Sequence, residues 1–253
     1  MARIGFLGTG EIAAVLVETL AGQGHEILVS TRNADRAQDL CERFPEVRVC
    51  ANKALVAGSE LVVVCLLPPV ARQILGSLPF RAEQRLVSVM TDISCAELAT
   101  LCAPVGSVAR MIPLPTLKGG QSPLACYPDH PDIRRLFAGQ ALILPTPDEA
   151  ALNSLFVASA LLLPVLDQLD AAAHWLSGRI GGERVAEQYL IRLFGSYFDR
   201  LAQDPAPGFN TVRAELNTEG GLNQTLSKRM AEAGTPEILV EGLEILMHRL
   251  KAA

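Results

Sequence analysis

The sequence predicts an α/β domain built on a doubly wound, parallel sheet, followed by an all-helical domain. Two observations predict the first part. Short apolar runs alternate with amphipathic helical segments, and the runs are apolar nearly throughout, as in strands covered on both faces. A third observation predicts the second part, because every periodic segment after about residue 168 has helical spacing. The predicted domains are therefore 1–168 and 169–253.

The α/β pattern opens with an apolar run at 2–7 that ends at Gly8, and a helix with apolar positions at helical spacing follows it. Pro68 and Pro69 end the strongly β-branched run at 61–67, since proline donates no hydrogen bond to a sheet. The predicted strands are 2–7, 26–30, 47–50, 61–67, 86–90, 108–112, 123–127, 141–144 and 164–166. The predicted helices are 11–21, 35–44, 71–78 and 148–161, then 171–176, 183–201, 211–216, 221–233 and 236–251.

Composition narrows the class of protein. Of 253 residues, 49% are hydrophobic and 19% charged, which is typical of a packed globule rather than a disordered chain. The net charge of −5 argues against a nucleic-acid partner. The longest uncharged stretch, 150–166, contains polar residues and Pro164, so we expect a buried helix and strand there and no membrane contact. Six cysteines without a CxxC pair or a Cys/His cluster, and no secretory leader, predict reduced thiols, no metal and a cytoplasmic location.

A glycine motif stands between the first strand and the first helix: Gly8-Thr9-Gly10-Glu11-Ile12-Ala13. The first glycine permits a tight turn, the second lets a pyrophosphate approach the backbone, and the small third residue lets helix pack on strand. Free N–H groups at the helix start then face the phosphates. In this strand–turn–helix context the motif predicts a Rossmann-type dinucleotide-binding domain.

The end of the second strand indicates which dinucleotide binds. An NAD site commonly has a carboxylate there to hold the ribose 2′-hydroxyl, whereas this chain has Ser30-Thr31-Arg32-Asn33. Arg32 can pair with a 2′-phosphate, and Ser30 and Asn33 can donate hydrogen bonds to it. We therefore predict NADP(H) as the cofactor.

A second glycine motif, Thr218-Glu219-Gly220-Gly221-Leu222-Asn223, precedes a predicted helix. Backbone N–H groups at such a helix start favour an anion through unsatisfied donors and the helix dipole. Thr218 and Asn223 can add side-chain hydrogen bonds. An ordinary helix-capping turn, with Thr218 as the cap, is the alternative.

Together these segments resemble the pyrroline-5-carboxylate reductase family, NAD(P)H-dependent imine reductases. The similarity is distant but spans nearly the whole chain. It includes both glycine motifs, Leu61 to Pro68, Leu86 to Met90, Arg110-Met-Ile-Pro113 and Leu176-Ser177-Gly178. The resemblance implies hydride transfer to a small cyclic imine or imino acid, as in proline biosynthesis. It places Asn52, Leu66, Leu67, Pro68 and Pro113 near the cofactor, Ser177, Glu219, Gly220 and Gly221 near the substrate, and Thr218 and Asn223 as catalytic residues.

The chain departs from that family at several positions. Leu67 stands where members have Lys, Leu114 where they have Asn, Glu219 where they have Pro, and Asn223 where they have Thr. The changes fall around the nicotinamide and the substrate, so they leave the cofactor prediction intact and the substrate open. An ionised Glu219 would also weaken the binding of a carboxylate at the neighbouring turn.

Two other functions are alternatives for this sequence. A β-hydroxyacid-type dehydrogenase needs a catalytic lysine in its interdomain helix, but no lysine lies between Leu144 and Leu216. A non-catalytic NADP-binding sensor or regulatory protein fits the altered substrate-side residues. Assays with cyclic imines and NADPH separate them, since a sensor binds NADPH without oxidising it.

The helical part of the sequence predicts that the protein is an oligomer. Apolar residues between Leu190 and Leu201 cover more than one face of their helix, so it must be buried on most sides. A domain of this size hardly buries such a helix alone, and the resembled family pairs these helices between subunits. We therefore predict a homodimer formed through an all-helical dimerisation domain.

Overall fold

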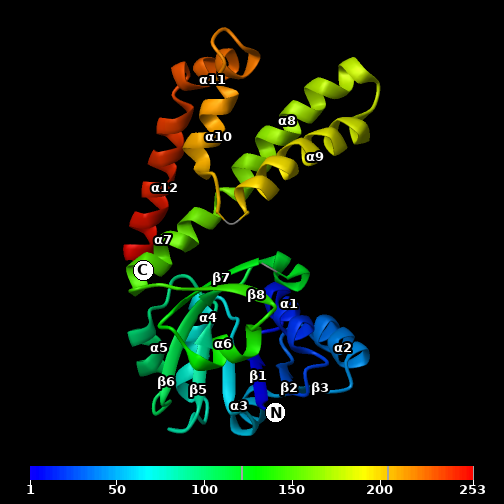
Figure 1. The fold of residues 1–253 in the computed structure, drawn as a ribbon. Helices are drawn as coiled ribbons and strands as arrows, with labels where there is room; N and C mark the ends of the chain where they lie inside the picture. Colours follow the sequence, from blue (N-terminus) through cyan, green and yellow to red (C-terminus); the bar gives the residue numbers. More distant parts are fainter. Residues whose placement is uncertain (121, 204, 253) are drawn as a thin grey trace. The chain divides into compact units, whose positions relative to one another are not determined.

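The sheet that organises the N-terminal part of the chain has eight strands in the order β3-β2-β1-β4-β5-β6-β7-β8 (Figure 1). The structure, a computed structural model, describes residues 1–120, 122–203 and 205–252. The strands are β1 (Arg3–Leu7), β2 (Glu26–Ser30), β3 (Val47–Cys50), β4 (Leu61–Val64), β5 (Arg85–Ser88), β6 (Ser107–Ile112), β7 (Ser122–Tyr127) and β8 (Ala141–Pro145). The predicted α/β class is confirmed.

The helices of this part are α1 (Glu11–Leu20), α2 (Ala34–Arg43), α3 (Asn52–Gly58), α4 (Pro68–Ile74), α5 (Cys95–Leu101), α6 (Pro131–Phe137) and α7 (Glu149–Ser159), with short 3₁₀ segments η1 (Leu75–Ser77) and η2 (Pro115–Gly119). The helical segments that follow are α8 (Leu162–Ile180), α9 (Glu183–Leu201), α10 (Gly208–Leu216), α11 (Leu222–Glu232) and α12 (Thr235–Ala252).

Side chains alternate between two cores on the two faces of the sheet. On β4, Leu61 and Val63 face one core, and Val62 and Val64 face the other. The first core includes buried residues of α1, α2 and α6, and the second includes buried residues of α3, α4 and α5. Burial on both faces explains why the strands are apolar at nearly every position.

One strand pair departs from the predicted parallel sheet. β7 runs antiparallel to β6, while β8 is parallel to β7, and the other neighbouring strands are parallel. β6 ends at Ile112 and β7 begins at Ser122, so only η2 and a few further residues connect them. A parallel pair needs a crossover of about a dozen residues or more, so this short connection requires a reversal.

The predicted strand at 164–166 is wrong, because these residues lie in the first five residues of α8. Proline lacks an N–H, but the first turn of a helix leaves its N–H groups unpaired, so Pro164 is tolerated there. The expected burial of 150–166 is observed only in part, because Leu152 and Val157 are buried whereas the first residues of α8 are not. Leu162, Leu163 and Leu166 are 58%, 66% and 59% exposed.

The chain divides into two compact units, 1–156 with 249–253, and 157–248. The predicted boundary between residues 168 and 169 falls inside α8. In the second unit α8 and α9 pack against each other as an antiparallel pair. Gly181, in the left-handed conformation with φ of 77°, ends α8 and allows the turn into α9.

A buried histidine at the start of α6 contacts β6. His130 is 5% exposed, its Nδ1 accepts the backbone N–H of Asp132 at 3.3 Å, and its Nε2 lies 3.2 Å from Ser107 Oγ. Burial lowers the pKa of His130 below 6.5, although Asp132 opposes the shift. The folded protein therefore holds this ring neutral to lower pH than the unfolded chain does.

This difference predicts an acid-dependent loss of stability. As pH falls below about 6.5, the unfolded chain takes up the proton first, so the free energy of unfolding decreases. His130→Gln should reduce the slope of stability against pH between 7 and 5.5 in denaturant titrations. His174→Gln, at an exposed position, should leave the slope unchanged. An unaltered slope in the His130 variant contradicts the assignment.

Candidate functional site: a nucleotide pocket at the strand ends

The turn between β1 and α1 permits only glycine at its first position. Gly8 has φ of +96°, and a Cβ there would lie 2.3 Å from the carbonyl oxygen of Cys65. Its N–H donates to the hydroxyl of Ser30 at 2.8 Å. Gly8 therefore joins the carboxyl ends of β1, β2 and β4 in one tight turn, the edge where ligands bind in open α/β sheets.

Thr9 fixes the other side of the same turn. Its hydroxyl donates to the carbonyl of Ser30 at 3.1 Å and accepts the N–H of Asn33 at 3.3 Å, and its side chain is buried. Asn33 caps α2 by accepting the N–H of Arg36 at 3.3 Å. The loop that carries Arg32 is thus tied to the glycine turn.

These loops enclose a pocket of about 520 Å³. It is lined by Gly8, Thr9, Gly10, Arg32, Asn33, Ala34, Asp35, Cys65, Leu66 and Leu67. Seven of these were predicted as cofactor-binding residues, and the structure brings them together. Ala34, Asp35 and Cys65 were not predicted, although Cys65 directly follows β4 and its place at a strand's carboxyl end could have indicated it.

Six predicted cofactor residues do not line this pocket: Glu11, Ile12, Ser30, Asn52, Pro68 and Pro113. Ser30 is 1% exposed and its hydroxyl accepts the Gly8 N–H, so it holds the turn. Glu11 and Ile12 occupy the first turn of α1. Asn52 begins α3, Pro68 begins α4, and Pro113 is buried after β6.

The pocket suits a diphosphate on physical grounds. A Cβ at Gly10 would meet no atom within 4 Å, so the backbone of this turn is open to a close ligand. The first intrahelical bond of α1 runs from Ala14 N–H to Gly10 O, which leaves the preceding N–H groups of the helix available. Arg32 is exposed and adds a positive charge beside them.

The pocket offers no nucleophilic thiol or metal centre. Burial raises the pKa of Cys65 to about 12, so its thiol stays protonated at neutral pH. No group of three or more His, Cys, Asp or Glu side chains able to hold a metal ion occurs in the parts of the chain that the structure describes. All six cysteines are free, and Cys102 and Cys126 are the two that are fully buried.

An ion pair between a buried arginine and a partly exposed glutamate connects β6 to neighbouring elements. Arg110 on β6 is 1% exposed and donates to Glu149 Oε1 at 2.6 Å and to the carbonyl of Thr91 at 2.7 Å. Glu149 also accepts the N–H of Cys95 at 2.8 Å. The pair therefore joins β6, the loop after β5 and the starts of α5 and α7. The sequence motif around Arg110 did not reveal this structural role.

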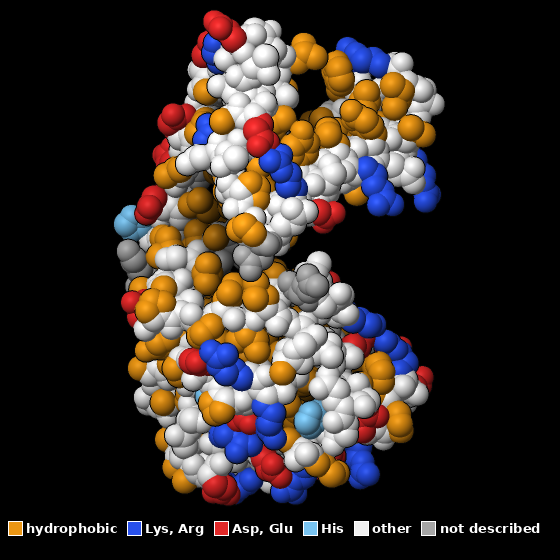
Figure 2. All heavy atoms as spheres, in the orientation of Figure 1, with side chains coloured by type: hydrophobic (Ala, Val, Ile, Leu, Met, Phe, Trp, Pro, Cys, Tyr) orange, Lys and Arg blue, Asp and Glu red, His pale blue; other side chains and the backbone are white. Residues whose placement is uncertain are grey.

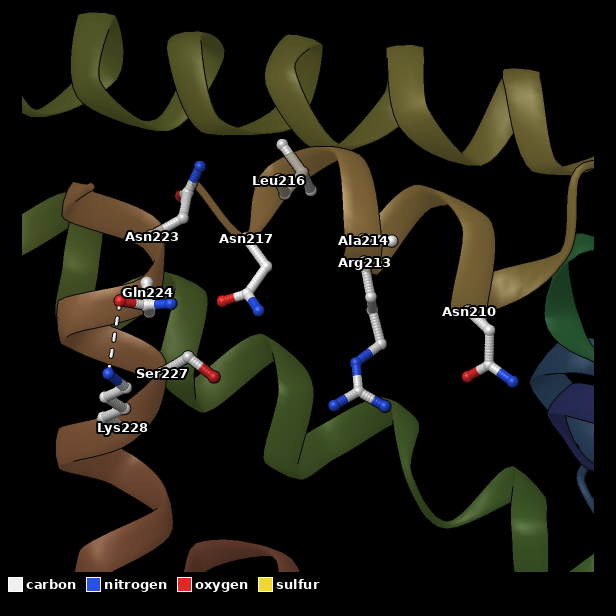
Figure 3. Close-up of a pocket in the computed structure, with 9 residues that line it drawn as sticks. All are labelled: Asn210, Arg213, Ala214, Leu216, Asn217, Asn223, Gln224, Ser227 and Lys228. Atoms are coloured by element: carbon white, nitrogen blue, oxygen red, sulfur yellow. Dashed lines mark hydrogen bonds between the residues drawn. The ribbon is translucent and has the colours of Figure 1, made fainter. Parts of the chain in front are cut away.

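The predicted substrate-side residues lie in the helical unit. Ser177 lies on α8, where its hydroxyl donates to the carbonyl of His174 at 2.8 Å. Thr218, Glu219, Gly220 and Gly221 form the turn between α10 and α11, and Asn223 lines a hollow beside it (Figure 3).

The two glycine N–H groups of that turn are already paired. Gly220 donates to Gln224 Oε1 at 3.1 Å, and Gly221 donates to the carbonyl of Thr218 at 2.9 Å. Among the described residues, the N–H groups of Leu222, Asn223 and Gln224 in the first turn of α11 have no acceptor, and neither do those of Thr218 and Glu219 in the turn before it.

A family model matches the N-terminal part of the chain. Residues 3–92 match the family model described as "NADP oxidoreductase coenzyme F420-dependent". The pyrroline-5-carboxylate reductase of Pseudomonas aeruginosa is 29% identical over 116 residues, which cover 44% of this chain and 42% of that protein. The matched segment therefore spans less than half of the curated relative.

Solved structures match nearly the whole chain. The 1-pyrroline-5-carboxylate reductase of Streptococcus pyogenes has a TM-score of 0.83 at 17% identity, covering 100% of this chain and 99% of that one. The chain therefore has the fold of this reductase. Plasmodium falciparum pyrroline carboxylate reductase, solved with NADP bound, has a TM-score of 0.80 at 12% identity, covering 99% and 97%. The fold of these reductases, including their helical C-terminal part, is thus the fold of this chain.

The two glycines of the β1–α1 turn should respond differently to alanine. Gly8→Ala should destabilise folding, because a positive φ costs alanine about 1–2 kcal/mol before the clash with Cys65 is counted. Gly10→Ala should fold normally, since φ of −75° and open space accommodate a methyl group, but it should weaken NADPH binding at least about tenfold. Thermal unfolding and fluorescence titration measure both. Equal behaviour of the two variants contradicts this assignment.

Proposed function

We propose that the protein is an NADP(H)-dependent oxidoreductase that transfers a hydride to a small cyclic imine or imino acid. The observation that carries this proposal is the pocket at the ends of β1, β2 and β4, with its glycine turn and Arg32. The NADP-bound Plasmodium relative, with the same fold, supports the choice of cofactor. The match to pyrroline-5-carboxylate reductases supports the choice of substrate class.

In this proposal, NADPH and the residues of the chain have separate roles. NADPH supplies the hydride when bound. The first turn of α1 and Gly10 hold its pyrophosphate, and Arg32 pairs with its 2′-phosphate. Leu66 and Leu67 give the pocket an apolar wall at the end of β4. An iminium ion already carries its proton on nitrogen, and its carbon accepts the hydride, so the chain needs no strong general acid. The contribution of the chain is orientation.

The preference for NADPH over NADH tests whether Arg32 binds the 2′-phosphate. Arg32→Asp removes the partner of the 2′-phosphate and adds a hydroxyl acceptor. NADPH affinity should fall roughly ten- to hundredfold, as expected for the loss of one charged hydrogen bond, while NADH affinity holds or improves. Titration of both cofactors against the same preparation supplies the internal control. An unchanged NADPH/NADH ratio contradicts this role for Arg32.

Turnover distinguishes an enzyme from a binding protein. Leu67 and Leu114, which stand where the resembled family has Lys and Asn, favour a non-catalytic NADP-binding sensor as the second candidate. We expect NADPH oxidation with cyclic imines such as 1-pyrroline and 1-pyrroline-5-carboxylate, and none without an imine. Tight NADPH binding with no oxidation across the panel would favour the sensor. Oxidation with keto acids alone would point to a hydroxyacid-type dehydrogenase.

We also propose an oligomeric state for the protein. In unit 157–248 the buried apolar residues are Val157, Ala173, Ala186 and Val212. Large apolar side chains remain uncovered on α8 and α9, including Trp175 at 60%, Tyr189 at 58%, Ile191 at 65% and Phe198 at 55% exposed. Figure 2 shows hydrophobic side chains gathered along these two helices. A partner surface must cover apolar area on this scale, and we propose a second copy of the chain.

The alternative to a second copy of the chain is a membrane that covers these helices. By length and composition alone, the stretch Glu149–Ile180 could cross a bilayer. An 18-residue window within it has a mean hydropathy of 1.7, and 11% of that window is buried. The stretch is interrupted at 160–161, and α8 carries Asp167, Asp170 and Arg179. These charges fit a protein interface with a polar rim better than a lipid-embedded helix, so we propose a cytoplasmic homodimer.

Sedimentation equilibrium at micromolar concentration tests the dimer. The expected mass is twice the 27.1 kDa of the chain, without detergent. Ile191→Asp and Phe198→Asp, on the exposed faces of α9, should shift the protein toward monomer. A monodisperse species near 27.1 kDa, or a requirement for detergent or lipid, would contradict the homodimer.

A further inference from the structure

One acidic side chain lines the nucleotide pocket at the ends of β1, β2 and β4. Asp35 lies in the first turn of α2, and it lines the pocket together with Arg32. The other described lining residues are glycines, neutral polar residues and apolar residues. A ligand in this pocket therefore meets one side chain of each charge.

Neither charge has a partner within the protein. The side chains of Arg32 and Asp35 are exposed and make no hydrogen bond or ion pair with any other residue that the structure describes. Asp39, further along α2, is by contrast held by Arg43, whose Nη1 donates to its carboxylate at 2.9 Å. The Asp35 carboxylate is thus available to whatever occupies the pocket.

Local hydrogen bonds keep Asp35 beside the glycine turn. Asn33 caps α2 by accepting the N–H of Arg36 at 3.3 Å, and its own N–H donates to the Thr9 hydroxyl at 3.3 Å. These two bonds flank Asp35 in the sequence and tie the start of α2 to the pocket. The backbone of Asp35 is therefore fixed in the same loop-to-helix junction as that of Arg32.

The usual acceptor for a ribose hydroxyl is missing from the end of β2. An NAD site commonly has a carboxylate at this position, where this chain has Ser30. Ser30 is 1% exposed, and its hydroxyl accepts the Gly8 N–H at 2.8 Å. Its side chain is therefore engaged in the turn, and Asp35 is the carboxylate that lines the pocket instead.

We infer that Asp35 is a specificity-determining residue that lets the protein bind NADH as well as NADPH. The inference rests on the proposed function for the place of the dinucleotide. A phosphate monoester carries about −1.5 to −2 charges at neutral pH, so Arg32 attracts the 2′-phosphate of NADPH and Asp35 repels it. The 2′-hydroxyl of NADH is neutral and donates a hydrogen bond to the Asp35 carboxylate. Each cofactor thus has one favourable charged partner in the pocket.

Fluorescence titration of Asp35→Asn with NADPH and NADH tests this inference. Loss of the negative charge should tighten NADPH binding about three- to tenfold and weaken NADH binding severalfold, so the ratio of the two affinities rises at least about tenfold. The gain for NADPH should shrink as salt is added, because salt screens the repulsion that the substitution removes. Asp39→Asn, on α2 outside the pocket, is the matched control and should leave the ratio unchanged.

The same variants are titrated with 2′-phosphoadenosine diphosphate ribose and ADP-ribose, which lack the nicotinamide and should show the same change in ratio. An affinity ratio unaltered in the Asp35 variant, an equal change in the Asp39 variant, or no saturable binding of NADH to the unsubstituted protein would overturn the inference. Asp35-dependent discrimination without reduction of any imine would refute the proposed reaction alone. Imine reduction with a ratio insensitive to Asp35 would refute only the role of Asp35.

Discussion

The close approach of the β1–α1 turn to the end of β4 is the constraint on which the rest of the N-terminal unit depends. With a carbonyl oxygen 2.3 Å from where a Cβ would stand, Gly8 cannot be replaced without moving β1 or β4. Its N–H and the Thr9 hydroxyl then tie β2 to the same point. Three central strands therefore end together, and the pocket forms above them.

The two units obtain their stability in different ways. The N-terminal unit buries two cores, one on each face of its sheet. It also holds the buried guanidinium of Arg110 against Glu149, whose side chain is 25% exposed, so loss of Glu149 would leave a buried charge without its carboxylate. The helical unit buries few apolar side chains and exposes many. A second chain would therefore contribute to the stability of the helical unit as well as to its assembly, which couples folding to protein concentration.

Local periodicity was enough to predict the strands of the sheet and the long helix α9, whose bounds agree with the structure. It missed α3, α5 and α6, which have seven residues each and show too few turns for a helical repeat. It misassigned Pro164, because an apolar run with a proline fits a strand as well as a first helical turn. The glycine turn was predictable since its chemistry is local. The Arg110–Glu149 pair and the hollow beside Asn223 depend on contacts between distant segments or facing helices, which spacing alone does not reveal.

Transfer of isotope from cofactor to substrate tests the central claim most directly. NADPH carrying deuterium at one prochiral position of C4 is incubated with the protein and a cyclic imine, and the amine product is examined by mass spectrometry. If the protein transfers the hydride, deuterium appears on the former imine carbon with one of the two stereospecifically labelled cofactors and not with the other. A protein that binds NADPH but yields no labelled amine with either cofactor would contradict it.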